Sequence, residues 1–179
     1  MNPSCNLFLI GATGAGKTSV GRRLAAHYGL SFVDLDQEIE RHCGVPVGTV
    51  FEVEGEAGFR RRESALLDEC SRRRGVLLAT GAGAVLDPAN RRSLAERGYV
   101  AWLQATPELQ LERLRHDTQR PLLAGDDRQA RLQAMAEVRE PLYREIADLA
   151  IPAVHESVAA SSEHCIALID SLWQRQHAA

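Results

Sequence analysis

An eight-residue run between a short apolar stretch and a helical pattern constrains the fold of this chain most. The run is Gly11-Ala12-Thr13-Gly14-Ala15-Gly16-Lys17-Thr18, and it matches the pattern G-x-x-x-x-G-K-[ST] in full. Glycines let backbone N–H groups turn inward around phosphate oxygens, and the N-terminus of the following helix adds partial positive charge. We therefore predict a P-loop in which these eight residues bind ATP or GTP, with Lys17 on the β and γ phosphates and Thr18 on Mg²⁺.

The alternative, a chance glycine-rich turn between a strand and a helix, is disfavoured by the use of basic residues. Lys17 is the only lysine among the 21 lysines and arginines of the chain. The ammonium group is a compact charge with three donors, whereas the guanidinium group is a larger planar fork. The one lysine thus occupies the position at which phosphate binding by a P-loop needs it.

Composition indicates a single soluble domain that acts on small molecules. The chain has 179 residues, 45% of them apolar, and a net charge of −3 without a lysine-rich tract, so we expect no nucleic-acid partner. It has no apolar run of membrane-spanning length and no leader pattern at its N-terminus, so we expect a cytoplasmic protein with no membrane partner. Its four cysteines lie far apart, which indicates reduced thiols rather than a zinc site or disulfides.

Apolar strand patterns alternate with helical patterns along the whole chain. Strands are expected at about 6–10, 31–35, 76–79, 99–103 and 149–154. Helices are expected at about 16–28, through Ile39 and Val50, and at 63–74, 90–96, 106–115, 128–146 and 163–174. This alternation predicts an α/β fold of the P-loop NTPase type, with a five-stranded parallel sheet covered by helices on both faces and ligands at the C-terminal strand ends.

A P-loop alone does not separate a kinase from a GTPase switch or an ATPase motor, so a second substrate must be sought elsewhere. Asp34 and Asp36 alternate at the end of the second strand, which would point their carboxylates to opposite sides of the pleat. One could then support a metal ion and the other face an acceptor hydroxyl. Among the three consecutive arginines that follow, Arg61 and Arg62 are expected to be solvated surface charges.

Six ordered motifs make this sequence resemble the shikimate kinase family, and they extend over nearly the whole chain. They are the P-loop, Asp34-x-Asp36, the run from Phe51 through Gly55-Glu56 to Phe59-Arg60-x-x-Glu63, the turn Gly81-Ala82-Gly83, Arg120-Pro121-Leu122-Leu123, and Arg139-x-Pro141-x-Tyr143. The resemblance implies transfer of the γ-phosphoryl group of ATP to the 3-hydroxyl of shikimate. It also implies a monomer with Mg²⁺ as cofactor.

The resemblance implies a role for each matching residue. Lys17, Asp36 and Arg120 would be catalytic, with Asp36 at the attacking hydroxyl and Arg120 closing over the transferred phosphoryl group. Asp34 would support Mg²⁺ through water, and Arg113 would pack on adenine, with Arg115 as a competitor for that role. The remaining acceptor-binding residues would be Arg60 and Arg139, which clamp the carboxylate, together with Gly81, Ala82 and Gly83.

The chain is expected to form one domain, residues 1–179, with three parts, of which the stretch 116–127 is polar and contains Pro121 and Gly125. The core would comprise about 1–34, 76–112 and 128–179, with a helical substrate-binding insert at about 34–62 and a mobile lid at about 116–127. Within this framework the sequence departs from the family at two places.

Ala82 replaces the middle one of three glycines, which would cost about 1–2 kcal/mol if that residue needs positive φ. The stretch 155–158 lacks the usual small polar residues and proline near adenine. Two alternatives therefore stay open: a related kinase with another carboxylated acceptor such as gluconate, and a paralogue that binds nucleotide or shikimate without turnover.

Overall fold

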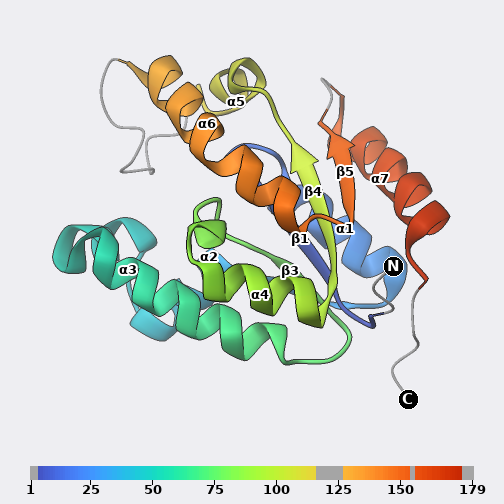
Figure 1. The fold of residues 1–179 in the computed structure, drawn as a ribbon, viewed down its shortest axis with the longest axis horizontal. Helices are drawn as coiled ribbons and strands as arrows, with labels where there is room; N and C mark the ends of the chain where they lie inside the picture. Colours follow the sequence, from blue (N-terminus) through green and yellow to red (C-terminus); the bar gives the residue numbers. More distant parts are fainter. Residues whose placement is uncertain (1–3, 116–126, 154–155, 175–179) are drawn as a thin grey trace.

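The protein is a three-layer α/β domain built on one parallel sheet (Figure 1), as the alternating pattern predicts. The computed structural model describes residues 4–115, 127–153 and 156–174. The sheet has five strands in the order β2-β3-β1-β4-β5. The strands are β1 (Leu7–Gly11), β2 (Ser31–Asp34), β3 (Val76–Ala79), β4 (Tyr99–Gln104) and β5 (Leu149–Pro152).

Helices cover both faces of the sheet. They are α1 (Lys17–Tyr28), α2 (Leu35–Cys43), α3 (Val47–Ser71), α4 (Pro88–Arg97), α5 (Pro107–Arg113), α6 (Arg128–Ile146) and α7 (Val158–Leu172), with a short 3-10 helix η1 (Ala84–Leu86). Side chains of β1 show how the two layers form. Leu7 and Leu9 join the core under α1 and α7, while Phe8 and Ile10 join the core under α3, α4 and α6. The two-residue period of a strand thus divides one apolar run between two cores.

The boundary of the second strand corrects one prediction. β2 ends at Asp34 and α2 begins at Leu35, so Asp36 lies in a helix and not on a pleated strand. The Asp34 side chain accepts hydrogen bonds from the backbone N–H groups of Asp36 and Gln37, at 3.1 and 3.3 Å, and so caps α2. The predicted alternation of the two carboxylates across a pleat is therefore wrong, because the Asp34 side chain binds the first N–H groups of a helix that begins at Leu35.

Other element boundaries also differ from the predictions. α3 runs from Val47 to Ser71 with a break at Gly55, where φ is 69°, so Glu63 lies inside a helix and does not begin one. β5 ends at Pro152, before the predicted end at 154. α7 begins five residues earlier than expected, because Ser157 caps it by accepting a hydrogen bond from the N–H of Ala160.

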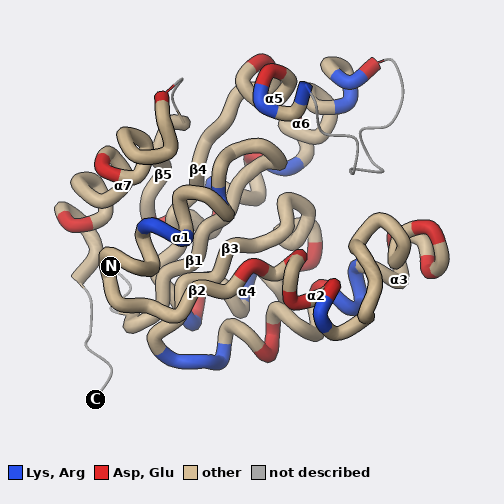
Figure 2. Tube along the Cα trace, turned by 180° about the vertical axis from the view of Figure 1, so that it is seen from behind, with Lys and Arg blue, Asp and Glu red and all other residues tan. Residues whose placement is uncertain are grey.

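Charges of both signs occur along α2 and α3 (Figure 2), and most ion pairs there are local. Arg61 and Arg62 are exposed as expected, and Arg62 pairs with Glu54. The four cysteines are free, with Cys70 and Cys165 buried. Within the described residues, no helix is long and apolar enough to cross a membrane.

Candidate active site

The P-loop curves between the C-terminal end of β1 and the first turn of α1. Gly14 and Gly16 have φ values of 72° and 97°, which side chains rarely tolerate, and a Cβ on Gly11 would overlap the carbonyl oxygen of Leu103 in β4. Lys17 Nζ donates to the carbonyl oxygens of Gly11 and Ala12, both at 2.8 Å. The glycines therefore set the shape of the loop, and the ammonium group lies inside the curve they make.

Thr18 and Asp34 meet beside the P-loop although they lie on different elements. Thr18 Oγ1 donates to Asp34 Oδ2 at 2.6 Å, while Asp34 Oδ1 caps α2. A hydroxyl and a carboxylate are hard oxygen donors, and Mg²⁺ is commonly held by one or two such groups together with phosphate oxygens and water. The pair therefore fits the Mg²⁺ predicted for this loop.

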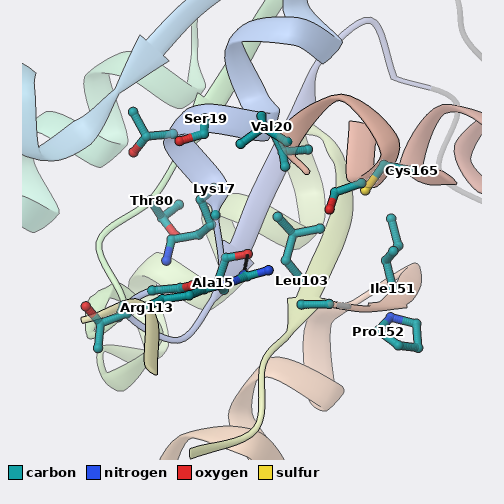
Figure 3. A pocket seen from close by; sticks show the side chains of 18 of the residues that line it. Ala15, Lys17, Ser19, Val20, Thr80, Leu103, Arg113, Ile151, Pro152 and Cys165 are labelled. Atoms are coloured by element: carbon teal, nitrogen blue, oxygen red, sulfur yellow. Dashed lines mark hydrogen bonds between the residues drawn. The ribbon is translucent and has the colours of Figure 1, made fainter. Parts of the chain in front are cut away.

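A cavity of about 480 Å³ opens along the P-loop (Figure 3). Its wall combines phosphate-side, acceptor-side and apolar residues: Thr13–Val20, Asp34, Asp36, Thr80, Ala82, Leu103, Arg113, Ile151, Pro152, Ala153, Glu156, Val158, Ser161, His164 and Cys165. Figure 3 shows Lys17 and Arg113 on the P-loop side, and Ile151, Pro152 and Cys165 on the β5–α7 side. Burial raises the pKa of Cys165 to about 11, so its thiol is a neutral part of that wall.

Arg113 is the arginine of α5 that reaches this cavity. Its Nη1 donates to the carbonyl oxygens of Gly14 and Ala15, at 3.1 and 3.3 Å. Arg115, the other candidate for contact with adenine, is absent from the cavity wall. The geometry thus favours Arg113 of the two.

A second group of charged residues is centred on Glu63 in α3 and includes side chains that were predicted to bind the acceptor. Only 1% of this carboxylate side chain is exposed, and Glu63 Oε2 pairs with Arg60 Nη1 at 2.5 Å. Arg60 also pairs with Glu56 at 3.2 Å, but 52% of the Glu56 side chain is exposed. Arg60 is therefore oriented chiefly by a buried partner.

Electrostatics tie Asp36 and Arg139 to the same group. The pKa of Glu63 is raised: burial is the largest cause, the nearby Asp36 carboxylate adds to it, and Arg60 and Arg139 oppose it. Two carboxylates and two guanidinium groups from α2, α3 and α6 thus act on one another. We call Asp36, Arg60, Glu63 and Arg139 the acceptor cluster.

The glycine-containing turn after β3 packs directly on the acceptor cluster. A Cβ on Gly81 would overlap Glu63 Oε1 and lie 3.2 Å from Asp36 Oδ1, and a Cβ on Gly83 would overlap the Arg60 guanidinium. Ala82 lies between them without positive φ, since no described residue other than glycine has one. The conditional cost predicted for Ala82 therefore does not arise, because close approach demands glycine only at the two flanking positions.

Arg139 is 9% exposed and lines a second cavity of about 300 Å³, which the sequence did not predict. That cavity lies against Trp102 and Tyr143, and Asp36 and Arg60 are not in its wall. Arg139 therefore interacts electrostatically with Glu63, but the four residues of the acceptor cluster do not line one common cavity.

Glu63 and Tyr143 had no predicted role, although both stand in motifs of the shikimate kinase resemblance. The three-residue spacing of Arg60 and Glu63 puts them on one face of a helix, which could have indicated their pairing. No comparable signal indicates that Tyr143 donates a hydrogen bond to the carbonyl of Ala82, 61 residues away. Arg120 and positions 116–126 of the predicted lid lie outside the described residues, whereas Asp127 caps α6 and belongs with that helix.

A P-loop, its adjoining hydroxyl–carboxylate pair and a charged acceptor cluster on a five-stranded parallel sheet define a P-loop kinase. Comparison with known proteins narrows this class. A family model described as shikimate kinase matches residues 13–170. The chain belongs to the shikimate kinase family.

Individual relatives agree with this assignment over nearly their full length. Shikimate kinase from Thiobacillus denitrificans is 47% identical over 172 residues, which cover 96% of this chain and 94% of that protein. The solved structure of shikimate kinase from Acinetobacter baumannii in complex with shikimate is 41% identical, with a TM-score of 0.91 and 95% of each chain covered. A gluconokinase from Sinorhizobium meliloti shares only the fold, at 19% identity and a TM-score of 0.61.

Proposed function

We propose that this chain transfers the γ-phosphoryl group of ATP to the 3-hydroxyl of shikimate, giving shikimate 3-phosphate and ADP. The observation that carries the proposal is the position of Asp36. It lines the cavity that contains Lys17 and Thr18, and it also acts on the buried Glu63 of the acceptor cluster. A hydroxyl held at Asp36 would therefore lie between the phosphate-binding loop and the guanidinium groups.

The P-loop side positions the phosphoryl donor. Backbone N–H groups of residues 11–18 surround the phosphates, and the ammonium group of Lys17 stabilises charge on the β and γ phosphates. Thr18, with Asp34 acting through water, would hold Mg²⁺, which neutralises phosphate charge when bound. Arg113 would pack on adenine.

The acceptor side positions the attacking hydroxyl. Arg60 and Arg139 bind the shikimate carboxylate, because a planar guanidinium pairs two N–H donors with two carboxylate oxygens. Asp36 accepts the hydrogen bond of the 3-hydroxyl, aligns its oxygen with the γ phosphorus and accepts its proton. The turn of Gly81, Ala82 and Gly83 would border the ring, and Arg120 would stabilise the charge of the transferred group.

A coupled ADP-release assay with purified protein, Mg²⁺ and ATP tests the proposal, with shikimate, gluconate or no acceptor. We expect shikimate-dependent turnover that falls about 10²- to 10⁴-fold in Asp36→Asn, the usual range for loss of a general base. Glu52→Gln, at an exposed position of α3, is the matched control and should keep wild-type turnover.

Each other outcome contradicts a different part of the proposal. ADP release with gluconate but not with shikimate would show that the chain is a kinase and that shikimate is not its acceptor. ATP binding without turnover on either acceptor would favour a non-catalytic paralogue. We further propose a cytoplasmic monomer that binds small molecules and neither nucleic acid nor membrane, and the mass in solution tests the oligomeric part.

A further inference from the structure

Tyr143 joins two parts of the acceptor site that lie far apart in the sequence. Its side chain is in α6, is 1% exposed, and donates from its hydroxyl to the carbonyl oxygen of Ala82 at 2.5 Å. The ring packs against Trp102 of β4, with 5.7 Å between the ring centroids. Burial raises the pKa of the Tyr143 hydroxyl, so it remains a proton donor throughout the neutral range.

The carbonyl that Tyr143 holds belongs to the turn on which the acceptor cluster packs. Gly81 lies against Glu63 and Asp36, and Gly83 lies against Arg60, so closely that neither accommodates a Cβ. A shift of the Ala82 peptide unit would therefore move the surface that Arg60 and Asp36 contact. The hydrogen bond from Tyr143 to this carbonyl therefore helps to hold the turn in place against Arg60 and Asp36.

Tyr143 also lies one helical turn after Arg139, on the same face of α6. Between them stands Pro141, which has no backbone N–H and so cannot make the helical hydrogen bond to the carbonyl of Glu137. The backbone of α6 is thus held by fewer hydrogen bonds at the segment that carries Arg139. Tyr143 follows this proline by two residues and ties the helix to the Ala82 carbonyl.

We propose that Tyr143 is a positioning residue that sets the distance between Arg139 on α6 and Arg60 beside the glycine turn. It acts through the Ala82 carbonyl and does not touch the reacting atoms. The inference rests on the proposed function, because the spacing of the two guanidinium groups matters for an acceptor with a carboxylate. Ala82 also lines the P-loop cavity, but the acceptor cluster packs on its turn, so a residue with this role should affect binding of the acceptor more than binding of the nucleotide.

Tyr143→Phe tests this inference, because it keeps the ring and removes only the hydroxyl. We expect KM for shikimate to rise about tenfold, the equivalent of one hydrogen bond. KM for ATP and kcat should stay within about twofold of the wild-type values. The hydrogen bond is expected to help bind the acceptor equally in the ground state and in the transition state, so its loss raises KM and leaves kcat unchanged. Tyr99→Phe is the matched control, because Tyr99 is 2% exposed and lies at the opposite end of the sheet from the site.

A double-mutant cycle with Arg139→Lys separates positioning from a general loss of structure. If Tyr143 acts by placing Arg139, its substitution should raise KM for shikimate less than threefold in the Arg139→Lys background, because the effects of coupled residues are not additive. Fully additive losses would overturn the inference. An unchanged KM for shikimate in Tyr143→Phe would overturn it, and so would an equal rise of KM for both substrates.

Amide hydrogen exchange tests the same contact without any assumption about the acceptor. The N–H groups of Ala84 and Leu86 bond to the carbonyls of Gly81 and Gly83, at 3.2 and 3.0 Å, and report on the turn. Their exchange should be faster in Tyr143→Phe than in Tyr99→Phe or the wild type. If wild-type protein does not phosphorylate shikimate, the proposed function fails, and unchanged exchange at these amides would then overturn the inference by itself.

Discussion

The phosphate-binding loop and the acceptor cluster are built in opposite ways. The loop consists of eight consecutive residues, and its glycines fix its shape locally. The acceptor cluster consists of side chains from α2, α3 and α6 packed on the turn after β3. A site made of neighbouring backbone groups needs few distant contacts, whereas a site made of side chains depends on how the helices pack.

The two regions also differ in how charge is handled. Lys17 donates to two carbonyl oxygens at the rim of its own loop. Glu63 is almost fully buried, and its ionised form is stabilised mainly by Arg60. Removing one member of a buried pair leaves an uncompensated charge, so substitutions in the acceptor cluster should be felt by its other members.

The largest expected effect is on the phosphate side. Lys17→Met should lower kcat/KM by about 10³-fold or more, because it removes the ammonium group that the proposed function places at the β and γ phosphates. Arg23→Met, at an exposed position of the same helix, is the control and should stay near wild type in the ADP-release assay. A loss below tenfold in Lys17→Met would contradict the role of the ammonium group.

Next in size is the effect of the buried partner of Arg60. Glu63→Gln should raise KM for shikimate about 10- to 100-fold with little change in KM for ATP, because a charge-assisted hydrogen bond is lost in a buried place. Glu56→Gln removes the half-exposed partner of the same arginine and should change KM about twofold or less. Equal effects of the two substitutions would show that burial of Glu63 does not matter to the acceptor.

A smaller effect is expected where the glycine turn meets Arg60. Gly83→Ala should raise KM for shikimate about tenfold, because the added Cβ displaces the Arg60 guanidinium from its position. The displaced group is the end of a flexible side chain, so the protein should still fold, which thermal melting would verify. Unchanged steady-state kinetics would show that Arg60 binds the acceptor from a different position.

The raised pKa of Glu63 gives a stability effect with a definite sign. The folded chain binds a proton at this carboxylate more tightly than the unfolded chain, whose pKa is near 4.5. Titration of Glu63 therefore leaves the free energy of unfolding unchanged below pH 4.5 and lowers it as the pH rises from 4.5 through the raised pKa. As the pH rises across this window, the melting temperature of wild type should fall relative to that of Glu63→Gln. A difference in melting temperature that does not change with pH would contradict a raised pKa of Glu63.

The smallest effect is expected at the departure from the family's glycine run. Ala82→Gly should leave kcat and both KM values within about twofold and lower stability by about 0.4–1 kcal/mol, since Ala82 adopts no positive φ and glycine gains entropy in the unfolded chain. Steady-state kinetics and chemical denaturation measure the two quantities. A large gain in activity would show that Ala82 does impair the site.

Local signals in the sequence were sufficient for most of the fold and for the P-loop. The apolar runs located β1, β3 and β4 to within a residue or so, and Thr106-Pro107 correctly indicated the start of α5, where Thr106 accepts from the N–H of Leu109. α6 was predicted with its observed ends, Arg128 and Ile146. Such features depend on residues close together in the chain, so a single sequence contains them.

Tertiary packing decided what the acceptor side looks like. The sequence alone indicated Asp36, Arg60 and Arg139 as acceptor-binding residues and a glycine-containing turn after β3. It did not show that Asp34 caps α2, that Glu63 is buried against Arg60, or that Tyr143 holds the Ala82 carbonyl. The cap and the Arg60–Glu63 pair join residues two or three positions apart, whereas the contact of Tyr143 with Ala82 spans 61 residues. The burial of Glu63 and Tyr143 comes from packing across the whole domain, which no local pattern records.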